Sequence, residues 1–312
     1  MSGRRQRGVA VLTAIFVMAL ASIAAASLAY RQNVSFHRTE ALKHSEQAWW
    51  VARGVADWAT TLLEKDGQDN NIDHLGEFWA TPVDYLPVDN GVVTGRIADL
   101  QGRFNLNNLA SAEPLYVEIF KRLILNIRLD GSAPTPDPEQ LVSAIQDWID
   151  PDVEPRFPGG AEDGIYFSRS PAYRAANRPF TSVTELRLVE GVSPELFQAL
   201  LPFVTALPEE TAININTAPA ELLLALSNNP SPGDVAAFVE TRAEEPAETL
   251  DVVTNDAILG PAVDVQGLSV STNYFLIQGE ATIGRGRVRL YSLVFRSAQG
   301  QARVVYQSRD TL

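Results

Sequence analysis

Cysteine is absent from this chain of 312 residues, and lysine and histidine are scarce, with three of each. The lack of cysteine excludes disulfides, thiol catalysis and zinc–thiolate sites. Three histidines leave little for an active site built on imidazole. The formal net charge of −13 gives a surface that repels nucleic acid and anionic lipid and suits divalent cations or protein partners. We therefore expect no nucleic-acid partner.

Proline and glycine are missing from the N-terminal part of the chain, which predicts an unusually long helix. No proline occurs between residues 9 and 81, and no glycine between residues 9 and 53. Residues 9–30 are uncharged and mostly apolar, long enough to cross a bilayer as one helix. Arg4, Arg5 and Arg7 precede this run and favour a cytoplasmic N-terminus. We expect a single-pass anchor in a bacterial inner membrane, with a C-terminal head in the periplasm.

The helical pattern continues beyond the apolar run. From Ala41 onward, small and apolar residues recur at steps of four and three, which places them on one face of a helix. The pattern predicts one helix from about Val9 to Lys65, ended by Gly67 and the polar residues 68–71. Three tryptophans are expected to pack this stem against a sheet or a partner helix: Trp49, Trp50 and Trp58.

Three interpretations of the N-terminus compete. A secretory signal peptide would be cut near the small residues 24–26. A twin-arginine signal is a weaker match, because no Phe-Leu pair follows Arg5. The third interpretation is an anchor that is uncleaved, or cleaved elsewhere, and whose helix enters the soluble part. The continuation past Tyr30 favours this third interpretation, because a discarded signal need not continue in phase into a mature helix.

The segment from Arg7 to Thr13 resembles the start of type IV pilins and pseudopilins. In that family a prepilin peptidase cuts before the apolar run, so the resemblance implies cleavage between Gly8 and Val9 and a leader peptide of residues 1–8. The family usually has glutamate five residues after the cut, where this chain has Thr13. A carboxylate in hydrocarbon needs a partner, which in this family is the amine of a neighbouring subunit. A subunit without it fits best at the tip of a fibre.

The strand pattern is split between two distant parts of the chain. One strand is expected at residues 91–100, and three more near the C-terminus at residues 273–282, 288–295 and 301–307, joined by hairpins. The predicted fold class is α+β: a long N-terminal transmembrane and stem helix packed on an antiparallel pilin-like sheet, with a large all-α domain inserted between strands. The expected boundaries are 9–66 for the stem, 67–110 and 266–312 for the pilin-like domain, and 111–265 for the insertion.

The insertion contains two segments that look like helix-hairpin-helix or SAM-like units, at residues 183–201 and 215–241. Helix starts are marked by a capping box of Ser182 with Glu185 and by prolines at first helical positions. Such units often grip DNA phosphates, which requires nearby cations. Residues 182–260 contain thirteen acidic residues and two arginines, so DNA binding is not expected.

An acidic block at residues 147–163 holds six carboxylates and a single arginine. Prolines and glycines impose loops there, and a hard cation such as calcium accepts six to eight oxygen ligands without strict geometry. The spacing excludes an EF-hand. The alternative is a solvated acidic loop that binds no metal, and residue types alone leave both interpretations open.

The acidic block, Thr13 and the chain length together resemble the minor pseudopilin K family of type II secretion. The family pattern Trp-Ile-Asp-x-Asp followed by Gly-x-Glu-Asp recurs at residues 148–152 and 160–163. The resemblance implies structural calcium. The expected ligands are Asp150, Asp152, Glu162 and Asp163, with Asp147 and Glu154 as further candidates.

The function expected from this resemblance is assembly. The chain would be a minor pseudopilin at the tip of the type II secretion pseudopilus, needed for assembly and length control of the fibre and for export of folded proteins across the outer membrane. The implied partners are the minor pseudopilins I and J, the major pseudopilin and prepilin peptidase. No enzyme activity is expected. The rival function is a membrane-anchored or secreted calcium-dependent enzyme, which would need a cleft with an activated base or nucleophile.

Processing distinguishes the interpretations of the N-terminus. We expect the protein extracted from membranes to have lost residues 1–8, because the resemblance implies a peptidase cut after Gly8. This cut leaves the apolar run in place as the membrane anchor. Intact-mass spectrometry measures this directly. A mass showing loss of about the first twenty-six residues would instead indicate a cleaved signal peptide, since such signals end at small residues after the apolar core.

Overall fold

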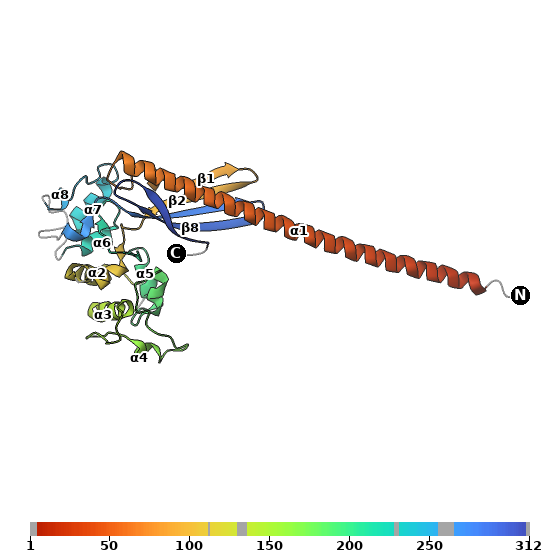
Figure 1. Cartoon of the computed structure of the whole chain (residues 1–312), viewed down its shortest axis with the longest axis horizontal. Coiled ribbons are helices and arrows are strands. Elements are labelled where there is room, and N and C mark those ends of the chain that lie inside the picture. Colours follow the sequence, from red (N-terminus) through yellow and green to blue (C-terminus); the bar gives the residue numbers. More distant parts are fainter. Residues whose placement is uncertain (1–4, 112, 130–135, 228–230, 255–264, 310–312) are drawn as a thin grey trace.

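One unbroken helix forms the N-terminal part of the molecule. In the computed structural model, α1 runs from Arg5 to Asp69, about 100 Å at 1.5 Å per residue. The structure describes residues 5–111, 113–129, 136–227, 231–254 and 265–309, so residues 1–4 of the expected leader lie outside it. The N-terminal part of α1 is long and apolar enough to cross a membrane and is not covered by the rest of the chain. Figure 1 shows it projecting beyond the sheet. The predicted continuous helix is confirmed.

The helix ends later than the sequence predicts. Gly67 was expected to stop the helix, yet α1 continues to Asp69. The reason for glycine is close packing: a Cβ atom at position 67 would lie 2.8 Å from the Arg296 side chain and 3.1 Å from the Gly300 backbone. Glycine therefore lets the end of α1 approach the C-terminal hairpin, at a small cost in helix propensity.

A five-stranded antiparallel sheet lies along the second half of α1 (Figure 1). Its order is β1-β2-β7-β8-β9. The strands are β1 (Val83–Val88), β2 (Gly91–Asp99), β7 (Tyr274–Ile283), β8 (Gly286–Arg296) and β9 (Ala302–Ser308). In the β2–β7 pair, Gly91 lies opposite Ile283 and Asp99 lies opposite Phe275. The two strands are neighbours in the sheet, although residues 100–273 separate them in the sequence.

The sequence analysis missed strand β1. The strand contains Pro87 and is largely exposed, with no alternation of buried and exposed residues. Such a segment carries no strand period, and proline is tolerated because β1 is an edge strand that pairs only with β2. The other four strands lie within one or two residues of their expected bounds.

The stem is held on the sheet by a row of small side chains. Five residues of α1 are at most 3% exposed and face β2, β7 and β8: Ala48, Ala52, Ala56, Ala59 and Leu63. Alanine allows the helix axis to lie close to the sheet, so the stem and the sheet share one core. The three tryptophans of the stem differ in burial. Trp49 is half-buried, whereas Trp50 and Trp58 are 58% and 52% exposed.

The inserted region has its own apolar core. That core begins at Phe104 and Leu106, ahead of the expected boundary at 111. Its elements are η2 (Leu106–Ala110), α2 (Pro114–Asn126), α3 (Pro138–Ile149), α4 (Asp163–Tyr166), η3 (Val183–Leu188), α5 (Pro194–Leu200), α6 (Ala220–Ala225), α7 (Pro232–Thr241), α8 (Asp251–Thr254) and η4 (Val265–Gly267). The expected capping box at Ser182 and the prolines at the starts of α5 and α7 are confirmed.

The insertion is helical apart from short strands at its edges. Two parallel pairs, β3 (Phe104–Asn105) with β4 (Val204–Thr205) and β5 (Ile213–Asn214) with β6 (Leu268–Ser269), join its two ends to its middle. Each first strand ends in a buried asparagine whose side chain accepts from the backbone N–H two residues later: Asn105 from Asn107, and Asn214 from Asn216. The repeated Asn-x-Asn is a sequence signal that the sequence analysis did not use.

A buried ion pair joins the end of the stem and the loop after it to β8. The Arg296 guanidinium of β8 donates from Nη2 to both carboxylate oxygens of Asp73 at 2.5 Å, and from Nη1 to Asp66 Oδ2 at 2.8 Å. Asp73 is fully buried and Arg296 is 5% exposed. The Thr272 N–H also donates to Asp73, at 2.7 Å. Stem, connecting loop and C-terminal strands therefore meet at one guanidinium.

Replacing Asp73 with alanine should destabilise the protein by about 3–5 kcal/mol, because it leaves a buried arginine without its main counter-charge. Urea denaturation followed by circular dichroism measures this change. The matched control is Asp69→Ala at the exposed end of α1, which should change the free energy of unfolding by less than about 0.5 kcal/mol. Equal effects of the two substitutions would contradict a structural role for the Arg296–Asp73 contact.

Candidate metal site and family relationships

The acidic block connects α3 to α4 at the far end of the inserted region (Figure 1). Asp150 is the C-cap of α3, and Glu162 is the N-cap of α4. Between them the chain turns through Pro151, Pro155 and Pro158, which have no N–H to donate and keep the segment out of regular structure. The two helix ends thus present carboxylates toward one short loop.

Three of the expected ligands meet. One carboxylate oxygen from each of Asp150, Asp152 and Glu162 lies within 4.8 Å of the others. Glu162 is buried, Asp150 is half-buried and Asp152 is exposed, so the group opens to solvent on the Asp152 side. Three negative charges at this separation repel one another strongly unless a proton or a cation joins them.

Several oxygen atoms at this point are buried with no hydrogen-bond partner. Among the described residues, they are Asp150 Oδ1, both carboxylate oxygens of Glu162, and Asn177 Oδ1. Buried polar atoms are rarely left unpaired, so each such atom calls for an explanation. Burial, together with the charges of Asp147 and Asp150, raises the pKa of Glu162 to about 7. The metal-free group therefore holds a proton more tightly than an ordinary glutamate.

The remaining candidates point elsewhere. Asp147 is fully buried, and its carboxylate accepts from the Arg156 N–H at 3.1 Å; burial raises its pKa. Asp163 accepts from the Ala175 N–H at 3.1 Å, outside the group of three. Glu154 is exposed. The structure thus brings together three of the six candidate residues.

Arg156 is the cation nearest this group. Its Nη2 donates to Asp150 Oδ2 at 2.8 Å, and its Nε lies 3.4 Å from Asp147 Oδ1. The guanidinium neutralises Asp147 and one oxygen of Asp150, but it leaves Glu162 unpaired. One arginine is therefore insufficient for the charge collected here.

Asn177 is a neighbour that the sequence analysis missed. Its Nδ2 donates to the Asp152 carbonyl at 2.9 Å, and its Oδ1 is one of the unpaired atoms. The residue has positive φ of 47°, a conformation that asparagine tolerates better than most residues. Because it lies 25 positions from Asp152, no local spacing could reveal it. Carboxylate and amide oxygens are the ligand types that a hard cation such as calcium prefers.

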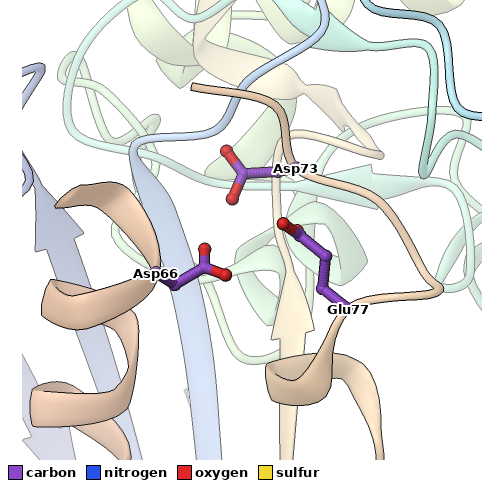
Figure 2. A group of neighbouring side chains, drawn as sticks. All are labelled: Asp66, Asp73 and Glu77. Carbon is purple, nitrogen blue, oxygen red and sulfur yellow. The ribbon is translucent and has the colours of Figure 1, made fainter. Parts of the chain in front are cut away.

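A second acidic group has hydrogen-bond partners from its own chain. Figure 2 shows Asp66, Asp73 and Glu77 with their carboxylates turned toward one another at the end of α1 and in the loop that follows. Arg296 donates to Asp66 and Asp73, as described above. Glu77 accepts from the Trp79 indole at 2.7 Å and the His74 N–H at 3.0 Å. A guanidinium and neutral donors therefore bind oxygens of all three carboxylates, while burial raises the pKa of Asp66 to about 6 and that of Asp73 to about 7.

The two arginines of the region that holds the expected helix-hairpin-helix segments make different contacts. Arg187 lies over the Phe197 ring at 5.6 Å. Arg242 is buried and donates to the carbonyls of Ile215 and Ala218 at 2.8 and 2.6 Å. The second segment includes residues 228–230, which lie outside the described residues. Arg242 is therefore unavailable to a phosphate, whereas Arg187 is exposed.

At the N-terminus, the Gly8–Val9 bond lies within α1. The Thr13 hydroxyl donates to the Ala10 carbonyl at 2.9 Å, so the helix itself satisfies this side chain. A glutamate at this position could not be satisfied in the same way, since a carboxylate only accepts. Threonine is therefore compatible with a position that has no charged partner.

Comparison with known proteins agrees with this architecture. Models of the family described as type II secretion system (T2SS), protein K match residues 102–209 and 213–271. The type II secretion system protein K of Pseudomonas aeruginosa is 36% identical over 313 residues, spanning 97% of this chain and 92% of that protein. The protein K of Aeromonas hydrophila is 33% identical, spanning 95% of this chain and 94% of that protein.

A solved structure shares the fold. It is the crystal structure of the GspK-GspI-GspJ complex from the enterotoxigenic Escherichia coli type 2 secretion system, in which the matching chain has a TM-score of 0.71 and 25% identity. The match covers 88% of this chain and all of that one. Because the family models cover more than half of the sequence and relatives above 30% identity extend over nearly all of it, this chain belongs to the type II secretion system protein K family.

Proposed function

We propose that this chain is the minor pseudopilin at the tip of a type II secretion pseudopilus, needed for assembly and length control of the fibre and for export of folded proteins. The observation that carries the proposal is the single helix that begins in the apolar segment and becomes the spine of the head. Such a helix transmits the position of the membrane anchor to the sheet without a hinge. The insertion makes the head broad, which suits a subunit with nothing above it (Figure 1).

Its partners follow from the same proposal. The related Escherichia coli protein was crystallised with GspI and GspJ, so the I-type and J-type minor pseudopilins of its own system are the partners in the tip complex. The major pseudopilin lies below, and prepilin peptidase removes residues 1–8. The anchor lies in the inner membrane with the head in the periplasm, an orientation supported by the arginines before the apolar run. The acidic surface and the burial of Arg242 argue against nucleic acid.

The site at Asp150, Asp152 and Glu162 binds calcium in this proposal, with a structural role. Support comes from the unpaired buried oxygens of Asp150, Glu162 and Asn177, which match the oxygen ligands that calcium prefers. A bound cation would lock the end of α3 to the start of α4 and hold the loop between them. Asp163 and Asp147 would not be ligands, because their carboxylates accept from the backbone N–H groups of Ala175 and Arg156 respectively. In this role the site orders the head and catalyses nothing.

An export assay in cells distinguishes a role in fibre assembly from an enzyme activity. Deleting the gene should stop export of folded substrates, and the full-length chain should restore it. A version in which a cleavable signal peptide replaces residues 1–30 should accumulate in the periplasm yet fail to restore export, because a fibre subunit must keep its stem. Substrate in the medium is the measurement. Restoration by the released head would overturn the proposal and favour a soluble activity.

Melting curves test calcium. Calcium at 100 times its Kd should stabilise the purified chain by about 2.7 kcal/mol, since it binds only the native form. Without calcium, the protonated Glu162 stabilises the fold fully below its ordinary pKa of 4.5, and this contribution is lost as pH rises through about 7. Relative to Glu162→Gln, which does not titrate, the metal-free wild type should become less stable as the pH rises from 5 to 8.

The matched control for this experiment is Glu154→Gln, an exposed residue of the same loop. This variant should retain both the calcium response and the pH dependence of the wild type. Glu162→Gln should lose most of the calcium response. An identical calcium response in both variants would show that the ion, if bound, lies elsewhere.

A further inference from the structure

Three carboxylates meet where the stem, the loop after it and the insertion come together. One oxygen from each of Asp66, Asp73 and Glu77 lies within 4.8 Å of the others, and Figure 2 shows the three side chains turned toward one another. Among the described residues, Arg296 is the one cation with an ion pair to this group, and it pairs with Asp66 and Asp73. Three carboxylates therefore face one positive charge at a largely buried site.

Glu77 is the carboxylate that no cation contacts within the part of the chain that the structure describes. Its Oε2 accepts from the Trp79 indole at 2.7 Å and from the His74 N–H at 3.0 Å, and its Oε1 accepts from Asn70 Nδ2 at 3.0 Å. Its side chain is also hydrogen-bonded to that of Asp66. Two ionised carboxylates have only acceptors, so a hydrogen bond between them requires a proton on one of them. The geometry of the group therefore calls for one bound proton.

Burial and repulsion between the carboxylates hold that proton. Burial, together with the charge of Glu77, raises the pKa of Asp66 to about 6. Burial also raises the pKa of Asp73 to about 7, against the opposing effect of Arg296. Because the three groups interact, the proton belongs to the group as a whole. It is held at mildly acid pH and released as the pH rises past neutrality.

The other charged groups around the site do not replace this proton. Asp99, at the end of β2, adds a further negative charge near Asp73. The charge of Arg103 acts on Asp99. The His74 imidazole accepts from a backbone N–H through Nδ1, so it is not a cation in this arrangement. Lys65, in the last turns of α1, is exposed.

The loop that carries Asp73 and Glu77 connects the stem to the insertion. The Asp73 N–H donates to the Val270 carbonyl at 2.9 Å, and the Asp73 carbonyl accepts from Asn214 Nδ2 at 3.0 Å. Asp66 is the member of the group that lies on the stem. Loss of the proton replaces the hydrogen bond between Asp66 and Glu77 with repulsion between two charges. The contact between stem and loop is therefore the one that weakens, whereas the backbone contacts of the loop with the insertion are kept.

We propose that these three carboxylates form a proton-operated latch, which fastens the end of the stem to the loop of residues 70–80, and so to the insertion, only while it holds its proton. The latch acts within this chain and goes beyond the proposed function. The raised pKa values mean that it stabilises the closed form below about pH 6 and loses this effect as the pH rises through about 7. It is a switch in which a local charge change releases one packed element from another.

Hydrogen exchange of the full-length chain in detergent micelles tests the latch. After correction for intrinsic exchange rates, the amides of residues 70–80 should exchange at least about tenfold faster at pH 8 than at pH 5.5. The reason is that a state that requires one bound proton weakens up to tenfold for each pH unit above the pKa. The amides of α2, which lies in the separate core of the insertion, should show no such change. Equal protection of residues 70–80 at both pH values would overturn the proposal.

Two substitutions remove the need for the proton. Asp66→Asn and Glu77→Gln each leave two carboxylates facing one guanidinium and keep an amide able to hydrogen-bond in place of the lost group. Both variants should keep residues 70–80 protected at both pH values, and if one fails to fold the other decides. The matched control is Asp69→Asn, an exposed carboxylate in the last turn of α1, which should retain the pH dependence of the wild type. Retained pH dependence in a folded latch variant, or its loss in the control, contradicts the latch.

Spin labels measure whether the insertion moves relative to the stem. The absence of cysteine allows Asp57→Cys on the stem and Gln198→Cys on α5, both exposed, to be labelled without background. The distance distribution from double electron–electron resonance should be narrow at pH 5.5 and broader at pH 8, and Asp66→Asn should keep it narrow at both. Equal widths for the wild type would show that the insertion stays fixed and that no latch operates. These measurements need no partner protein, so their failure would leave the proposed function, tested by export, unaffected.

Discussion

The arrangement of stem, sheet and insertion depends on the ion pairs of the Arg296 guanidinium. Arg296 is the last residue of β8, and it pairs with Asp66 near the end of α1 and with Asp73 in the next loop. Its guanidinium also lies over the Phe275 ring at 4.7 Å. Burying an arginine is costly unless its charge and its donors are all matched. Because Asp66 and Asp73 lie far from Arg296 in sequence, only the complete fold supplies that match.

The insertion is tied to the same junction by neutral hydrogen bonds. Asn214 donates to the Asp73 carbonyl, to Asp99 and to the Thr272 hydroxyl, at 2.9 to 3.1 Å. Thr217 and Thr272 also donate to Asp99, whose pKa is raised by burial. The buried network fixes the direction in which the insertion leaves the sheet. The broad head therefore has one orientation relative to the stem, as a subunit at the end of a fibre requires.

Sequence reasoning succeeded where one physical period dominates. The alanine row of α1 and the alternation in β7 and β8 both mark a single buried face, so helix and strands were predicted closely. It failed where the cause is distant in sequence. β1 is an exposed edge strand with no period, and Gly67 is explained by Arg296 rather than by a helix end. In the acidic block, residue spacing could not show that Asp163 accepts from the Ala175 N–H. Nor could it show that Asn177, outside the block, donates to the Asp152 carbonyl.

The pairing of β2 with β7 has a consequence for how the protein is made. Translation and membrane insertion proceed from the N-terminus, so α1 and β2 emerge long before the strand that β2 must pair with, near residue 280. During that interval the alanine face of the stem and one side of β2 have no cover from their own chain, and pairing over such a separation in sequence is slow. The insertion has its own core and can fold first. Completion of the sheet is then the last event of biogenesis, and an interrupted or shortened chain would remain in the membrane as an anchored helix with an open edge.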